Sequence, residues 1–168
     1  QTCALPISSD TTTQYATATD TPTVVKWNTL GASNLFTLNV DSTATAGATG
    51  LFKITYSLQL ANNHNSAQNV VVWLRVNGVD VVGSSTIFTL PARKSAGVPA
   101  YVCAYSEVVF SLTKDDVVGL YWGTDQAATS GGTTGTYIYA QAAQTTPMAY
   151  PSTPSAIGSI TFVSGPLT

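Results

Sequence analysis

The dipeptide Asn77-Gly78 is the feature that most constrains how this chain can fold. It separates two short apolar runs, at residues 70–76 and 79–82. Both central residues of a two-residue type I′ turn need positive φ, a conformation that Asn and Gly adopt more readily than other residues. The dipeptide therefore predicts a β-hairpin with a tight turn at these two positions.

The turn also determines which residues of the hairpin lie opposite one another. Arg75 is expected opposite Asp80, where a cross-strand ion pair contributes up to about 1 kcal/mol. We interpret this pair as structural rather than catalytic. The neighbouring positions are apolar, and four side chains are expected to face the core together: Leu74, Val76, Val79 and Val81.

Apolar and polar residues alternate along most of the remaining chain, and a period of two predicts strands. The alternation is clearest in residues 50–61 and 98–112. No segment keeps the period of a helix, so we expect no substantial helix. About 8–10 short antiparallel strands separated by turns predict an all-β sandwich or barrel. Shorter candidate strands lie at 23–29, 34–40, 117–122, 137–142 and 157–163.

Charged side chains are scarce in this chain. Its 168 residues include only six Lys and Arg and eight Asp and Glu, which is 8% against about 25% in an ordinary soluble domain. The 44% of hydrophobic residues is enough to form a core. A net charge of −2 argues against a nucleic-acid partner, because phosphate contacts need clustered Lys and Arg. No apolar run approaches the roughly 20 residues of a membrane span, so we expect no membrane partner.

The sequence lacks the residue groupings on which common enzymes depend. The single histidine, His64, lies in a polar loop with no second histidine for a metal site. The Gly-x-Ser-x-Gly motif around a hydrolase nucleophile is absent. Asp115-Asp116 is interpreted as a solvated turn, and Glu107 and Asp125 have no evident partner carboxylate. We therefore expect no enzymatic activity, no metal and no cofactor.

The N-terminal segment differs in composition from the rest of the chain. Residues 1–22 are rich in Thr, Ser and Asp, which predicts an extended arm followed by one domain at residues 23–168. An extended arm can pair with the sheet edge of another chain; a floppy terminus is the alternative. We expect free thiols at both cysteines, with Cys103 buried, although a bridge to Cys3 is the alternative. The candidate anchoring residues of the arm are Cys3, Leu5, Pro6, Ile7 and Tyr15.

Tyrosines gather in the second half of the chain. If Trp122 faces the core, Tyr121 faces outward, and Tyr137 and Tyr139 share the face opposite Ile138. Outward tyrosines in a chain with few charges are typical of a subunit interface. A platform for sugar rings and a second core layer between sheets are the alternatives. The candidate interface residues are Tyr101, Tyr105, Tyr121, Tyr137 and Tyr139.

Several segments resemble known jelly-roll proteins. Residues 50–57, Gly-Leu-Phe-Lys-Ile-Thr-Tyr-Ser, resemble a strand of tumour necrosis factor-like and complement-like jelly rolls. Residues 72–80, Val-Trp-Leu-Arg-Val-Asn-Gly-Val-Asp, more specifically resemble a hairpin of small jelly-roll proteins from tailed bacteriophages. Residues 112–122 and 154–160 are similar to later segments of the same proteins, except that Asp115 stands where the family usually has glycine.

The resemblance implies a jelly-roll sandwich that assembles as a homotrimer on the exterior of a virion. Such a protein is a head-decoration (cement) protein or a fibre head, and it is not an enzyme. We therefore expect a structural virion protein whose arm holds the major capsid protein or another virion subunit. The alternative is a tail-fibre or spike head that binds a host receptor or glycan through the loops at residues 62–68 and 125–135.

Overall fold

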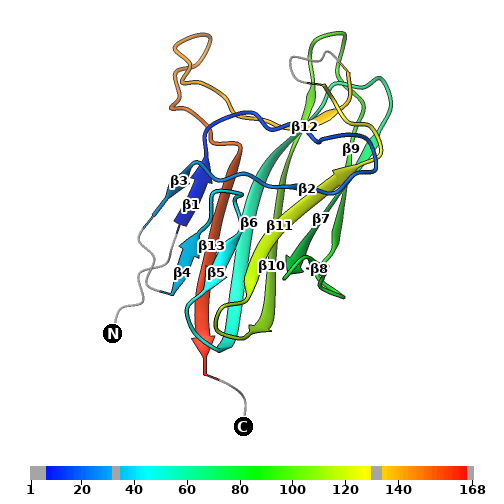
Figure 1. Ribbon diagram of the computed structural model, residues 1–168. Coiled ribbons are helices and arrows are strands. Elements are labelled where there is room, and N and C mark those ends of the chain that lie inside the picture. The colour runs from blue at the N-terminus through cyan, green and yellow to red at the C-terminus, as the bar shows by residue number, and fades with distance from the viewer. Residues whose placement is uncertain (1–6, 32–34, 130–133, 166–168) are drawn as a thin grey trace.

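The computed structural model describes residues 7–31, 35–129 and 134–165. Within these ranges the chain forms thirteen strands and no helix. The strands make two antiparallel sheets that pack face to face, as Figure 1 shows. The all-β sandwich predicted from the sequence is confirmed. The strands outnumber the 8–10 expected because several segments of two to four residues also pair.

The first sheet, called sheet A, has the order β10-β6-β13-β1-β3, with β12 also pairing with β6. Its two longest strands pair along thirteen residues each, from Leu112 opposite Gly50 to Ala100 opposite Asn62. Its strands are β1 (Ile7–Asp10), β3 (Thr29–Leu30), β6 (Gly50–Asn62), β10 (Ala100–Leu112), β12 (Thr136–Ile138) and β13 (Ala156–Ser164).

The second sheet, called sheet B, has the order β4-β5-β11-β7-β8, with β2 pairing with β11 and β9 with β7. Strands β7 and β11 form its centre, and seven residues of each are in register. Its strands are β2 (Thr23–Val24), β4 (Phe36–Leu38), β5 (Ala44–Ala46), β7 (Gln68–Val76), β8 (Val79–Asp80), β9 (Thr86–Leu90) and β11 (Val117–Thr124).

The core lies between the sheets and follows the predicted alternation. On β6 the five alternate side chains from Phe52 to Leu60 are buried, and on β11 Trp122 is fully buried. The ring of Phe52 packs edge-on against two other rings. Its centroid lies 5.1 Å from that of Phe36 in sheet B and 5.3 Å from that of Phe162 in β13. These three rings therefore join the two sheets at one end of the sandwich.

Replacing Phe52 with alanine is expected to lower the free energy of unfolding by about 3–5 kcal/mol, because a fully buried ring leaves a cavity. Denaturant unfolding followed by circular dichroism measures the change. Phe88→Ala serves as a control, since that side chain is only partly buried against the core. An equal loss in the two variants would contradict the central position of Phe52.

The hairpin at Asn77-Gly78 forms as predicted. Both residues have positive φ, 51° and 79°, and Arg75 pairs with Asp80. The expectation that Val79 faces the core is wrong, since its side chain is 70% exposed. Strand β8 contains only two residues, and β9 replaces it beside β7 from residue 86 onward. No strand was expected at residues 86–90, where β9 lies.

The expected division between an arm at 1–22 and a domain from residue 23 is wrong for residues 7–22. Strand β1 lies inside sheet A, between β13 and β3. Gln14 is buried and its side-chain amide exchanges hydrogen bonds with the backbone of Lys26, at 2.8 and 3.1 Å. Residues 7–22 are thus part of the sandwich. Of the candidate anchoring residues, Ile7 begins β1, while Cys3, Leu5 and Pro6 lie outside the described residues.

Cys103 differs from expectation in one respect. It is a free cysteine, but it is exposed on β10 rather than buried. Its sulfur lies 3.3 Å from the hydroxyl oxygen of Ser57 on the neighbouring strand. Strict alternation explains this position, because Val102 and Ala104 on either side face the core. Cys3, the partner in the alternative bridge, lies outside the described residues.

Candidate subunit interface

The outward side of sheet A presents a broad surface with few charges, which we call the tyrosine face. It consists of the outward positions of the sheet strands together with Tyr15 and Tyr139. Strand pairing places Tyr105 of β10 beside Ser57 of β6, and Ser57 beside Ile157 of β13. The larger apolar and aromatic side chains exposed there are Tyr101, Tyr105, Val109, Ile157 and Val163, each 43–61% exposed.

The outward strand positions of this face carry only two charges among the described residues, and these neutralise each other. Lys53 and Glu107 form an ion pair at 3.3 Å, and both side chains are partly exposed. The other outward positions hold Ser, Thr, Gln, Ala, Cys and apolar or aromatic residues. Large exposed apolar patches mark interaction sites more often than free surface. The tyrosine face is therefore the candidate for self-association.

Four tyrosines form a continuous cluster at one end of the face. Tyr15 stacks on Tyr137 with ring centroids 5.7 Å apart, and Tyr137 meets Tyr139 edge-on at 6.0 Å. Tyr139 in turn lies 5.1 Å from Tyr101 and donates a hydrogen bond to the side-chain oxygen of Gln141. Four of the five tyrosines predicted for an interface thus lie on one face. Tyr15, predicted as an anchoring residue, joins them.

This clustering changes how the phenols titrate. Burial, and secondarily the neighbouring Tyr101, Tyr139 and Tyr15, raise the pKa of Tyr137 to about 12. An unfolded tyrosine titrates near pH 10. The folded state therefore favours the neutral phenol, and the stability that this contributes is complete below about pH 10 and lost as the pH rises to about 12.

The free energy of unfolding is accordingly expected to fall between about pH 10 and about pH 12, and to fall less in Tyr137→Phe. The variant removes only the hydroxyl that ionises. Urea unfolding at a series of alkaline pH values measures this, with tyrosinate absorbance as a second signal. The same decrease in Tyr137→Phe as in the parent protein would contradict the assignment.

The fifth predicted tyrosine, Tyr121, lies elsewhere. It projects from β11 on the outward side of sheet B, with its ring 6.4 Å from that of Trp73 on β7. The guanidinium carbon of Arg75 lies 4.5 Å from the Tyr121 ring centroid, within the range of a cation–π contact. Tyr121 is thus separated from the other four by the thickness of the sandwich.

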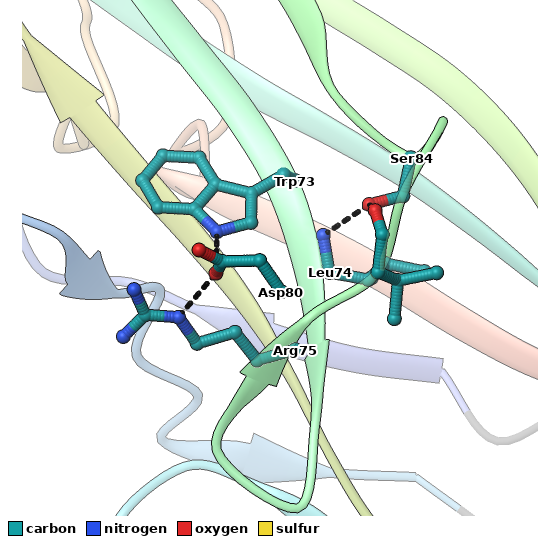
Figure 2. Close-up of polar contacts among 6 residues, drawn as sticks. Trp73, Leu74, Arg75, Asp80 and Ser84 are labelled. Atoms are coloured by element: carbon teal, nitrogen blue, oxygen red, sulfur yellow. Dashed lines mark hydrogen bonds and ion pairs between the residues drawn. The ribbon is translucent and has the colours of Figure 1, made fainter.

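Asp80 connects this second aromatic group to the hairpin. Figure 2 shows the side chains of Trp73 and Arg75 pointing toward its carboxylate. The indole Nε1 of Trp73 donates a hydrogen bond to Asp80 Oδ1 at 2.6 Å, and the Nε of Arg75 donates to the same oxygen at 2.5 Å. The hydrogen bond from Arg75, followed by that from Trp73, lowers the pKa of Asp80, and the same bond raises the pKa of Arg75. These contacts give Arg75 and Asp80 the structural role that the sequence predicted.

The remaining sequence candidates occupy structural positions. His64 lies in the β6–β7 loop, where its Nδ1 is 2.8 Å from both the Ser66 hydroxyl and the Gln68 amide. Asp116 accepts a hydrogen bond from the Asn77 side chain at 2.7 Å, which ties the hairpin to the β10–β11 turn. In the described ranges, no three His, Cys, Asp or Glu side chains are placed to hold a metal ion. The same ranges contain no helix long and apolar enough to cross a membrane.

Comparison with known proteins bears on the fold. No protein-family model matches the chain, and no curated protein sequence does. Among solved structures, Eiger TNF from S. frugiperda superposes with a TM-score of 0.56 at 12% identity, over 98% of this chain and 94% of that one. The chain therefore has a TNF-like jelly-roll fold, as the sequence resemblance implied. At this identity the likeness concerns the fold alone.

Proposed function

We propose that this chain is a structural subunit that assembles as a homotrimer through the tyrosine face and decorates the exterior of a tailed-phage particle. The main support for self-association is the exposed, almost uncharged outward side of sheet A. Four tyrosines cluster there: Tyr15, Tyr101, Tyr137 and Tyr139. The number of subunits and the phage particle rest on the sequence resemblance of residues 50–57 and 72–80.

The chemistry of the face suits burial between subunits. Tyrosine rings supply large contact areas at a low cost in side-chain entropy, and charged residues are depleted in interface cores. Lys53 and Glu107 are already paired within one subunit, so burial would leave neither charge alone. The low charge of the whole chain fits a subunit that is permanently assembled, because a free monomer depends more on surface charge for solubility.

The proposed role is mechanical. Decoration needs no bond to be made or broken, and the subunit would act by bridging and covering shell proteins. Contact with the major capsid protein or another virion subunit is assigned to residues 1–6, since residues 7–22 belong to the sandwich. A decoration protein held by three such segments gains affinity through multivalency.

Imaging of particles with a labelled chain tests this proposal. Many copies spread over the shell are expected. A few copies confined to one vertex would instead support the alternative, a tail-fibre or spike head. Absence of the chain from purified particles would overturn the virion assignment, while leaving the fold and the self-association to be tested in solution.

A further inference from the structure

A groove crosses the outward side of sheet B, away from the tyrosine face. Its volume is about 700 Å³, which is within the range of small-molecule sites. Its floor is formed by β7 and β11, one wall by the segment before β2, and the other by β8 and the connection to β9. Figure 1 labels these strands. Its lining residues include Asp20, Asn69, Trp73, Asp80, Gly123 and Asp125.

The indole of Trp73 forms part of the floor and lies against the sheet. A Cβ atom placed on Gly123 would be 3.6 Å from Cη2 of the indole and 3.7 Å from its Cζ3, so the six-membered ring covers this glycine. Trp73 is half-buried and lines the groove, which leaves ring surface available to a ligand. The 2.6 Å hydrogen bond to Asp80 fixes the orientation of the ring before anything binds.

Hydrogen-bond acceptors surround this ring. The carboxylate of Asp20 forms no hydrogen bond or ion pair within the described ranges, and its side chain is exposed. The carboxylate of Asp125 accepts two hydrogen bonds from the Asn69 backbone N–H at 3.0 Å and one from the Asn69 side chain at 3.2 Å. Asp80 uses one oxygen for Trp73 and Arg75, so its second oxygen remains available.

The charge of the groove distinguishes between possible ligands. No Lys or Arg is among its lining residues, so an anion finds no partner there. Arg75 neutralises Asp80, and Asp125 accepts hydrogen bonds from Asn69, so Asp20 is the lining carboxylate without a partner in the described ranges. A flat apolar ring beside several oxygen acceptors suits a molecule with one C–H surface and many hydroxyl donors.

We propose that this groove binds an uncharged saccharide, with one sugar ring stacked on Trp73 and its hydroxyls donating to Asp20 and Asp80. The site is on the opposite sheet from the tyrosine face, so it is available in an assembled subunit. The proposal does not depend on a virion location. Of the loops at 62–68 and 125–135 that the sequence suggested for glycan contact, the groove shares only Asp125, and none of the exposed tyrosines suggested for the same contact lines it.

An array of neutral hexose and N-acetylhexosamine oligosaccharides, with sialylated counterparts and a polylysine peptide, tests the ligand class. The full chain is expected to bind at least one neutral oligosaccharide and to bind sialylated forms more weakly. No binding to any neutral oligosaccharide, a preference for sialylated forms, or binding to polylysine alone would overturn the proposal.

Titration of the best neutral oligosaccharide against variants tests the residues. Trp73→Ala is expected to weaken binding about 30-fold, as truncation of an aromatic hot spot does. Trp73→Phe keeps a ring and is expected to restore most of the affinity, which shows that the loss is not due to misfolding. Ile87→Ala, on the same sheet but outside the groove, is the control and should bind normally.

Unchanged affinity in Trp73→Ala would overturn the assignment of Trp73 to the saccharide site. Monomeric variants of the tyrosine face are expected to bind each sugar as the parent does, which separates this site from assembly.

Discussion

The double substitution Tyr101→Arg and Tyr105→Arg is expected to convert the proposed trimer into monomers. Both side chains are at least 50% exposed on β10, so the isolated subunit should tolerate arginine there. In the proposed trimer each subunit would instead bury two guanidinium groups without partners, and a buried unpaired charge costs several kcal/mol. Sedimentation or light scattering should show the mass falling to that of one 17.4 kDa chain.

Ile87→Arg is the matched control for this substitution. Ile87 is 67% exposed on β9, on the outward side of sheet B, so the variant places one arginine on the other side of the sandwich. Its mass is expected to equal that of the parent protein. If the Ile87 variant dissociated and the Tyr101/Tyr105 variant did not, the result would contradict an interface at the tyrosine face and would indicate one on sheet B.

Deleting residues 1–22 is expected to abolish stable folding, rather than merely to release the protein from particles. The deletion removes β1 from between β13 and β3 and exposes the edges of both strands. It also removes four hydrogen bonds of Gln14, two with the backbone of Lys26 and two with the backbone of Ile138. The loss, about 5 kcal/mol or more, is comparable with the whole stability of many domains.

Deletion of residues 1–6 alone separates anchoring from folding. This shorter variant keeps β1, so its unfolding transition is expected to match that of the parent protein. If residues 1–6 hold the shell, it should also be lost from particles. A folded, cooperative transition after deletion of 1–22 would contradict the role of β1, and full decoration after deletion of 1–6 would contradict the anchor.

Much of the sandwich could be predicted because its signals are local. The two residues of the hairpin turn set their own pairing, and strict alternation identified the buried sides of β6 and β10. The one error within the hairpin, at Val79, arose because β8 ends after two residues. The sequence alone does not indicate where β9 takes its place beside β7.

The position of residues 7–22 could not be predicted for a different reason. The segment is rich in Thr, Ser and Asp, and its partner β13 lies about 150 residues further along the chain. Its polar side chains form long-range hydrogen bonds, such as that from the Gln14 side-chain amide to the Ser155 hydroxyl at 3.2 Å. No periodicity in the segment signals such pairing.

The candidate interface was predictable in part. Alternation showed that the tyrosines point outward, but it does not say to which sheet a strand belongs. Tyr121 follows β11 into sheet B, whereas Tyr101 and Tyr105 follow β10 into sheet A. The groove beside Trp73 was missed, because its walls come from segments about 50 residues apart or more that only the fold brings together.

The mass of the native protein in solution is the most direct test of self-association through the tyrosine face. We expect a single species with three times the 17.4 kDa mass of the chain, in which the exposed Cys103 of that face is protected from thiol reagents. Cys3→Ser should be included so that Cys103 is the only thiol. A stable monomer of 17.4 kDa with a fully reactive Cys103 would contradict the proposed assembly.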